Sequence, residues 1–132
     1  MCILKAMKAI LLIDHGSVRQ EANEMLGAMV ELVQRQLGAA TIVRYAHMEL
    51  AEPSIARGFA DCVEAGADEI IAFPYMLSPG KHSTRDIPRL VSEAAASYPG
   101  VRYHVTPAFG VHEKLGEIIA ERAGVLTVSQ EA

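Results

Sequence analysis

The sequence predicts an α/β fold of the doubly wound kind, in which four parallel strands form one sheet with helices on both faces. Short, almost wholly apolar runs alternate with longer segments whose apolar residues recur at helical spacing, and this alternation is typical of βαβ units. No linker or low-complexity segment interrupts the pattern, so residues 1–132 are expected to form a single domain. Hydrophobic residues make up 51% of the chain, which argues against disorder.

Four segments have the character of strands. Residues 8–14 (KAILLID) and 69–74 (EIIAFP) are apolar at nearly every position, as expected of strands that are buried on both faces. Residues 41–49 (TIVRYAHME) form the second predicted strand and are less uniformly apolar. Residues 102–106 form the fourth, which Pro107 stops because proline cannot donate a hydrogen bond to the sheet.

Four helices are predicted from their end signals and from apolar stripes. Ser17 and Gln20 have the spacing of a capping box at the start of the first helix. Pro53 opens the second helix, Asp86 is the predicted N-cap of the third, and residues 113–122 form the last. The residues expected to face the core are Ala22, Met25, Leu26, Met29, Val33 and Leu37, then Ile55, Phe59, Cys62 and Val63, then Leu90, Val91, Ala94 and Ala95, and finally Leu115, Ile118 and Ile119.

Composition excludes several classes of protein. The net charge of -4 at pH 7 disfavours nucleic acid as a partner. The apolar run 9–13 is far shorter than the roughly 20 residues that span a bilayer, and it is also too short for the core of a secretion signal. Cys2 and Cys62 form neither a disulfide framework nor a CxxC metal site, so a reducing, cytoplasmic location is predicted. Because Met7 directly precedes the first strand, residues 1–6 are expected to be a dispensable extension.

Histidines gather where the predicted strands end. In open α/β sheets, ligands bind beyond the carboxyl ends of the strands. His15 follows the first strand directly, and His82 lies in the loop after the third. His47 and Glu49 end the second strand, and His112 comes after the fourth. We therefore expect a functional site at this edge of the sheet.

Two chemical capacities come together in this set. Neutral imidazole and carboxylate are good ligands for cobalt, iron and nickel ions, and imidazole also accepts protons near neutral pH. His15, His82 and Glu49 supply both capacities. Gly16 and Gly80, close to the two histidines, would let a large flat ligand approach the backbone.

Basic side chains surround the third loop. Lys81, Arg85 and Arg89 cluster there, and Arg19 follows His15 by one helical turn. Such residues suit the recognition of carboxylates on a substrate. A solvated surface is the alternative interpretation for each of them.

Each candidate residue also has an ordinary structural interpretation. His15 suits a turn before a capped helix, His82 a solvated loop, and Glu49 the protein surface. His112 suits the position before a helix, and His104 lies inside the fourth strand, where no chemical role is expected. Spacing alone supports a metal or catalytic site and the ordinary interpretation equally.

Three motifs follow the first three predicted strands. They are Asp14-His15-Gly16-Ser17, Met48-Glu49-Leu50-Ala51-Glu52-Pro53-Ser54-Ile55, and the stretch from Pro74-Tyr75-Met76-Leu77-Ser78-Pro79-Gly80-Lys81-His82 to Asp86-Ile87-Pro88. Together they resemble the motifs of the small CbiX/SirB family, the class II, ATP-independent sirohydrochlorin chelatases. The resemblance covers the chain from Met7 to about Arg122; its most specific part is the third motif, and Gly110-Val111-His112 is a weaker match.

The resemblance implies a chelatase-like (flavodoxin-like) fold and the insertion of cobalt or ferrous iron into sirohydrochlorin, for cobalamin or sirohaem biosynthesis. Relatives in methanogens use nickel. The divalent metal is then a substrate, and no tightly bound cofactor is expected. His15 and His82 match the two motif histidines of the family and are the expected metal ligands and catalytic residues. Glu49 matches a third family position with a catalytic role, and the tetrapyrrole is expected to contact Ser17, Gly80, Lys81, Arg85 and Arg89.

The resemblance also bears on assembly, on the division of roles and on the metal. Larger family members contain two copies of this unit facing one another, so a single copy is expected to form a homodimer around the macrocycle. We expect His82 to act as the base and His15 as the metal ligand. The residues of the second and third motifs are similar to those of the plant-type ferrochelatase branch, and this similarity favours iron as the metal. The cysteines of that branch's C-terminal iron–sulfur region have no counterpart, so no cluster is expected.

Three alternatives stay open on the sequence alone. A metal or tetrapyrrole carrier would bind the ligand without turnover, and a flavodoxin-like regulatory domain would bind neither. A phosphohistidine enzyme of the Arg-His-Gly type is disfavoured because Asp14 stands where the arginine is needed. No GxxxxGK[ST] loop is present, so no ATP site is expected. The physiological metal is left open, because first-row ions overlap in ligand preference.

Overall fold

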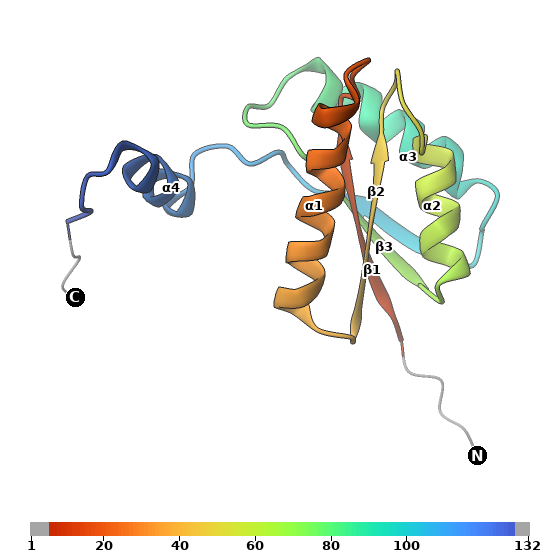
Figure 1. The fold of residues 1–132 in the computed structure, drawn as a ribbon. Helices are drawn as coiled ribbons and strands as arrows, with labels where there is room; N and C mark the ends of the chain where they lie inside the picture. Colours follow the sequence, from red (N-terminus) through yellow and green to blue (C-terminus); the bar gives the residue numbers. More distant parts are fainter. Residues whose placement is uncertain (1–5, 129–132) are drawn as a thin grey trace.

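Strands and helices alternate through the computed structural model, which describes residues 6–128. All four strands are parallel and lie in the order β2-β1-β3-β4 (Figure 1). The predicted α/β class and the four-stranded parallel sheet are therefore confirmed. In chain order the elements are β1 (Lys8–Asp14), α1 (Gln20–Leu37), β2 (Thr41–His47), α2 (Ile55–Glu64), β3 (Glu69–Pro74), the π-helical turn η1 (His82–Asp86), α3 (Ile87–Ala95), β4 (Arg102–Val105) and α4 (Glu113–Ala123).

The main core lies between the sheet and the pair α2 and α3. The central strands β1 and β3 send alternate apolar side chains, such as Leu11 and Ile70, into this core. Helix α2 contributes Phe59 and Cys62, and α3 contributes Val91. These predicted core positions are confirmed. Because β1 and β3 carry apolar residues on both faces, they form the rigid centre from which the loops at their carboxyl ends emerge.

Helices lie on both faces of the sheet, as predicted, but the face opposite α2 and α3 is only partly covered (Figure 1). Helix α1 lies on this side of β1 and β2, whereas α4 stands clear of the sheet (Figure 1). Leu26 is the one buried residue of α1, and α4 has none. The expected inward positions Met25, Ile118 and Ile119 are 71%, 47% and 69% exposed. Helical spacing identifies an apolar face but not the surface that covers it.

The side-chain caps predicted at two helix starts are not formed. The hydroxyl of Ser17 accepts a hydrogen bond from the Arg19 amide rather than from the first turn of a helix, and α1 begins only at Gln20. Asp86 takes the predicted N-cap position of α3, but η1 already places it in a helical conformation, and its carboxylate binds side chains instead of capping the helix. In both places the polar side chain forms a local hydrogen bond other than the capping bond, and the spacing of apolar residues does not reveal such bonds.

The remaining boundaries differ from prediction by a few residues. Ser54, not Pro53, caps α2, with its hydroxyl accepting from the Arg57 amide. Strand β2 ends at His47 and β4 at Val105, slightly before their predicted ends. Among residues 6–128, no helix is both long and apolar enough to span a bilayer. Cys2 and the predicted extension, except Ala6, fall outside the described residues.

Candidate functional site

The loops after β1 and β3 bring His15 and His82 together. The centroids of the two imidazole rings lie 4.2 Å apart with an interplanar angle of 82°, an edge-to-face contact. His15 is exposed, and 40% of the His82 side chain is exposed. Because β1 and β3 are adjacent parallel strands, their carboxyl ends open at the same edge of the sheet. The pairing of these two predicted site residues is thus a direct product of the topology, and both rings face solvent.

A carboxylate in the same helical turn orients His82. The Nδ1 atom of His82 lies 3.0 Å from Oδ2 of Asp86, within η1. Since Asp86 accepts, Nδ1 is the ring nitrogen that donates, and the lone pair of Nε2 is left for a metal ion or a proton. A neutral histidine is in this way prepared to act as a ligand or as a base.

Asp86 is held in its ionised form by its neighbours. Arg85 donates from Nε to Oδ1 of Asp86 at 3.1 Å. This hydrogen bond, with a smaller contribution from His82, lowers the pKa of Asp86 below its ordinary value. The ionised carboxylate of Asp86 accepts the hydrogen bond from Nδ1 of His82 and so keeps the orientation of the ring.

Local hydrogen bonds fix the chain that leads into His82. The Gly80 amide donates to the hydroxyl of Ser83, a buried residue. The Gly80 carbonyl accepts from both the amide and the hydroxyl of Thr84, the latter at 2.7 Å. These bonds close a turn whose geometry places His82 at the start of η1. Gly80 therefore serves the loop through its backbone, beside any role toward a ligand.

The loop carrying His15 is packed tightly against the loop after β2. Gly16 has φ +86°, and a Cβ atom at this position would lie 1.7 Å from the Glu49 carbonyl oxygen. The Glu49 amide donates to the His15 carbonyl at 3.1 Å. Only glycine fits this conformation and this space. Glu49 thus reaches the site through its backbone, and its exposed side chain stands at the rim.

A hydrogen-bonded pair at the carboxyl ends of β1 and β2 is a feature that the sequence interpretation missed. His47 is 1% exposed, and its Nδ1 lies 2.6 Å from Oδ1 of Asp14. The same carboxylate oxygen accepts from the Gly16 amide at 3.0 Å. Asp14 therefore ties the turn after β1 to the end of β2. The available signal was the register of parallel strands, in which two polar residues, Asp14 and His47, end adjacent apolar strands side by side.

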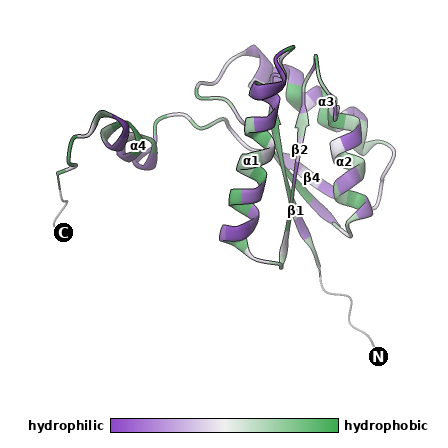
Figure 2. Ribbon diagram, in the orientation of Figure 1, coloured by the Kyte–Doolittle hydropathy of each residue, from purple (hydrophilic) through white to green (hydrophobic). Residues whose placement is uncertain are grey.

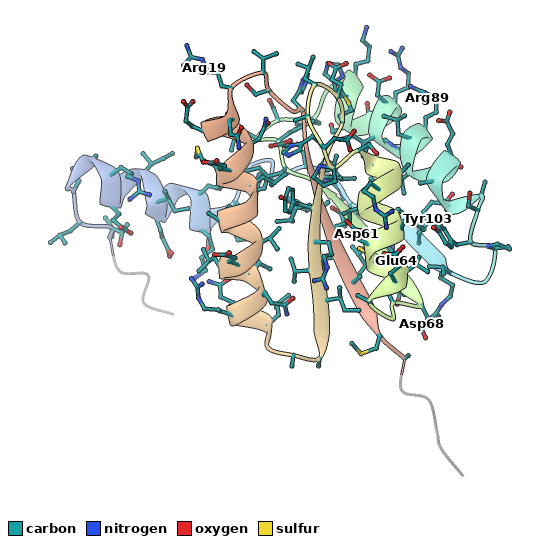
Figure 3. All side chains as sticks on the ribbon, turned by 45° about the vertical axis from the view of Figure 1, so that its right-hand side comes forward. Arg19, Asp61, Glu64, Asp68, Arg89 and Tyr103 are labelled. Atoms are coloured by element: carbon teal, nitrogen blue, oxygen red, sulfur yellow. The ribbon has the colours of Figure 1, made fainter. Side chains whose placement is uncertain are left out.

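The predicted basic residues occupy the same edge but are partly engaged with acidic neighbours. Arg85 binds Asp86, and Arg89 binds Glu93 at 3.1 Å. Lys81 makes none of the ion pairs found within residues 6–128. In Figure 3, the side chains of Arg19 and Arg89 point away from the sheet on opposite sides of this edge.

Other predicted residues serve local structure. Asn23 accepts from the Ser17 amide and donates to the Ser17 carbonyl, which closes the turn before α1. His112 caps α4, with Nδ1 accepting from the Lys114 amide. His104 is exposed on β4.

The protein side chains at this edge provide few ligands for a metal ion. No group of three or more His, Cys, Asp or Glu residues able to hold a metal is found within residues 6–128. His15 and His82 therefore offer two imidazoles, and the other ligands of a bound ion must come from water, from substrate or from a second molecule. Such an open arrangement suits an ion that is transferred rather than stored.

Proteins with related sequences are named for one kind of reaction. The chain is 42% identical, over 86% of its length, to half of the chloroplastic sirohydrochlorin ferrochelatase of Arabidopsis thaliana. It is 32% identical, over 88% of its length, to 37% of the sirohydrochlorin cobaltochelatase of Priestia megaterium. The chain thus spans half or less of the length of these relatives.

Solved structures match the fold. The sirohydrochlorin chelatase SirB of Bacillus subtilis in complex with cobalt has a TM-score of 0.79 and 31% identity, covering 89% of this chain and 50% of SirB. SirB from Bacillus subtilis with Fe3+ has a TM-score of 0.78 and 30% identity, covering 87% and 45%. The family model CbiX matches residues 9–125. With the paired histidines, the parallel sheet and this match over nearly its whole length, the chain belongs to the CbiX family.

Proposed function

We propose that this protein is an ATP-independent sirohydrochlorin chelatase, which inserts cobalt or ferrous iron into the macrocycle for cobalamin or sirohaem biosynthesis. The observation that carries the proposal is the contact between His15 and His82 at the carboxyl edge of the sheet, with Asp86 orienting His82. The names of the relatives, sirohydrochlorin ferrochelatase and cobaltochelatase, support the same reaction. Cobalt and Fe3+ in the SirB structures support a metal substrate.

The chemistry follows from the balance of protons. A divalent ion that enters the macrocycle replaces two pyrrole N–H protons, which must pass to a base. His82 accepts a proton at Nε2, because its Nδ1–H is bound to Asp86 and the carboxylate stabilises the resulting imidazolium. His15 holds the incoming ion until the pyrrole nitrogens replace the imidazole as ligands. Glu49, whose carboxylate stands at the rim, takes the second proton.

The edge of the sheet is also suited to an acidic macrocycle. We assign contacts with its carboxylates to Lys81, Arg85 and Arg89, together with Ser17 and the Gly80 backbone. Lys81 is exposed and provides a free ammonium group, whereas Arg85 and Arg89 each share a carboxylate of the protein. Arginine has several N–H donors, so a substrate carboxylate can be added to an existing pair.

The proposal extends to organisation and location. Residues 1–132 form one CbiX-type domain, and two copies associate as a homodimer that encloses the macrocycle. No nucleic acid or membrane is involved. A cytoplasmic location is supported by Cys62, which is buried as a free thiol and is suited to a reducing compartment.

Metal insertion is tested by absorbance. Sirohydrochlorin is mixed with the protein and with cobalt or ferrous ions without oxygen, and the rate is compared with spontaneous insertion. We expect His15→Ala and His82→Ala each to lower kcat by about a hundredfold or more. His104→Ala, which removes an exposed histidine outside the site, is the matched control and should keep the wild-type rate.

Two results would contradict the chelatase proposal. If both site variants insert metal as fast as wild type, the paired histidines are not the site. If the wild-type protein binds sirohydrochlorin tightly without accelerating insertion, the protein is a tetrapyrrole carrier. If the wild-type protein does accelerate insertion, the ratio of the cobalt rate to the iron rate ranks the two metals as substrates.

A further inference from the structure

His47 is a buried histidine that the reaction proposed above leaves without a role. It is the last residue of β2 and is 1% exposed. Burial of a polar ring costs free energy, so an apolar side chain would fill the same space with a smaller penalty. What imidazole adds at this position is a hydrogen-bond donor, and its Nδ1 lies 2.6 Å from Oδ1 of Asp14. The use of this donor therefore needs an explanation.

The Asp14 carboxylate connects His47 to the turn that carries His15. Because a carboxylate oxygen accepts, Nδ1 is the nitrogen of His47 that donates. The same oxygen of Asp14 also accepts from the Gly16 amide at 3.0 Å. Asp14 precedes His15 and Gly16 follows it, so one oxygen atom ties together the backbone on both sides of His15. His47 holds that oxygen in place.

His47 is itself fixed from several sides. Its backbone amide donates to the Pro53 carbonyl at 2.8 Å, which binds the end of β2 to the chain before α2. Its ring makes an edge-to-face contact with Tyr45, with the ring centroids 5.6 Å apart. A Cβ atom on Gly16 would lie 3.2 Å from Cβ of His47, so the turn packs directly against this residue. His47 is thus a rigid support for the Asp14 carboxylate.

The second nitrogen of His47 faces a polar hollow. A cavity of about 250 Å³ lies between this ring, Tyr45, Glu52 and the start of α1. Figure 2 shows that the first turn of α1 is hydrophilic. No hydrogen bond within residues 6–128 involves Nε2 of His47, and no buried side-chain nitrogen or oxygen in that range lacks a partner, so Nε2 opens into the hollow. Within the described chain, the imidazole therefore acts through Nδ1 alone.

His47 does not join the pair of imidazoles at the site. The ring of His15 contacts that of His82, whereas the ring of His47 contacts Tyr45. No group of three His, Cys, Asp or Glu residues able to hold a metal occurs in the described part of the chain, so His47 does not complete such a set with the other two histidines. Any effect of His47 on a bound ion must pass through Asp14 and the turn.

We propose that His47 is a positioning residue for metal binding by His15, and that it acts through its hydrogen bond to Asp14. This inference rests on the proposed function, because it presumes that His15 holds the incoming ion. A ligand on a turn binds tightly only when the turn is already held in one conformation. Gly16, at φ +86°, is free to take other conformations once the Asp14 carboxylate is released. The donor at Nδ1 of His47 keeps the turn, and hence the His15 ring, in place.

Two amide variants separate the donor at Nδ1 from the mere presence of a polar side chain. In His47→Asn the amide nitrogen can take the position of Nδ1 and donate to Asp14, whereas in His47→Gln it reaches the position of Nε2, toward the hollow. In the insertion assay we expect His47→Gln to raise the KM for cobalt by about tenfold or more, with the KM for sirohydrochlorin unchanged. His47→Asn should keep the KM for cobalt within about twofold of wild type.

Calorimetric titration with cobalt alone gives a second readout that does not depend on turnover. The Kd for cobalt should rise by about tenfold or more in His47→Gln and stay near the wild-type value in His47→Asn. Val43→Ala is the control for loss of stability, because Val43 is buried on the same face of β2 as His47. It should lower the midpoint of urea denaturation and leave the cobalt parameters unchanged. If His47→Gln fails to fold, His47→Leu, which also lacks the donor, takes its place.

The outcomes separate this inference from the chelatase proposal. If His15→Ala loses cobalt binding while folded His47→Gln keeps the cobalt parameters of wild type, the positioning role is overturned and the chelatase proposal stands. Equal losses in His47→Asn and His47→Gln would show that the ring is needed for its packing, and they would reject the role of the donor. If the wild-type protein neither binds cobalt nor accelerates insertion, the proposed function fails and the positioning role fails with it.

Discussion

The carboxylate of Asp86 is held in its ionised form beside the histidine pair. Its pKa lies below the ordinary value, mainly because Arg85 donates a hydrogen bond to it and further because of His82. A carboxyl whose pKa is lowered in the folded state adds to the free energy of unfolding at every pH above its unfolded pKa. This contribution is lost as the pH falls through the lowered value. Asp86 therefore stays ionised, and able to accept the hydrogen bond from His82, in the neutral pH range.

Asp86→Asn tests the orienting role of this carboxylate. We expect kcat for metal insertion to fall by about ten- to a hundredfold, with a smaller change in KM, since the amide cannot stabilise an imidazolium ion. Steady-state kinetics across pH 5–9 measures both parameters. Asp61→Asn, which alters a surface ion pair with Arg57 on α2 (Figure 3), is the control. Equal losses in the two variants would contradict the role assigned to Asp86.

At the same scale, the sequence allowed prediction of some site residues but not others. His15 and His82 were predictable because each follows a recognisable buried strand, and parallel topology then places them together. The Asp14–His47 pair was not, because it depends on which residues face each other across two strands. The hydrogen bond between His82 and Asp86 was not predicted either, because Asp86 had the sequence signature of a helix cap.

Among the elements, the turn after β1 is the most constrained. Gly16→Ala should lower the free energy of unfolding by at least about 2 kcal/mol and reduce activity, because its Cβ would overlap the Glu49 carbonyl at a positive φ. Urea denaturation and the insertion assay measure the two effects. Gly100→Ala is the control, since nothing lies within 4 Å of its Cβ position and the residue lies outside the proposed site. A stable, active Gly16→Ala protein would show that the turn relaxes without consequence.

Element boundaries were predictable to the degree that local sequence determines them. The bounds of β1 and β3 agree with prediction at every residue, because uninterrupted apolar runs leave no choice of face. The start of α1 does not, because Asn23 bonds the Ser17 backbone and delays the helix. Side chains that bond across several residues override the periodic signal at helix ends.

For the whole molecule, burial of Cys62 links stability to alkaline pH. Burial raises the pKa of this thiol to about 12, from 9.0 when it is exposed. The unfolded chain thus loses its proton first, and the free energy of unfolding should fall by up to about 1.4 kcal/mol per pH unit between 9 and 12.

Cys62→Ala removes the titrating group and is the comparison for this effect. Urea denaturation from pH 8 to 11 should show that the difference in free energy of unfolding between wild type and Cys62→Ala becomes smaller as the pH rises. Other alkaline titrations, such as those of tyrosine and lysine, are common to both proteins and cancel in the difference. A constant difference across this range would contradict the linkage.

The position of α4, clear of the sheet (Figure 1), is the part of the whole molecule that the sequence did not predict. Leu115, Ile118 and Ile119 have the spacing of a core-facing stripe, and α4 forms as expected. Their spacing carries no information on whether the covering surface belongs to the same chain. Topology over long distances along the chain, rather than local preference, decides that question.

The π-helical turn η1 has a consequence for how the family can vary. Its backbone bonds join residues five apart, such as the Ile87 amide to the His82 carbonyl, so the turn holds one residue more than an α-helical turn. Deletion of one residue would restore α-helical winding and rotate His82 by about 100° relative to Ile87 and Val91. The extra residue of η1 therefore sets the direction of His82 around the helix axis separately from the direction in which α3 faces the core. A lineage that lost this single residue would keep its fold while its imidazoles parted.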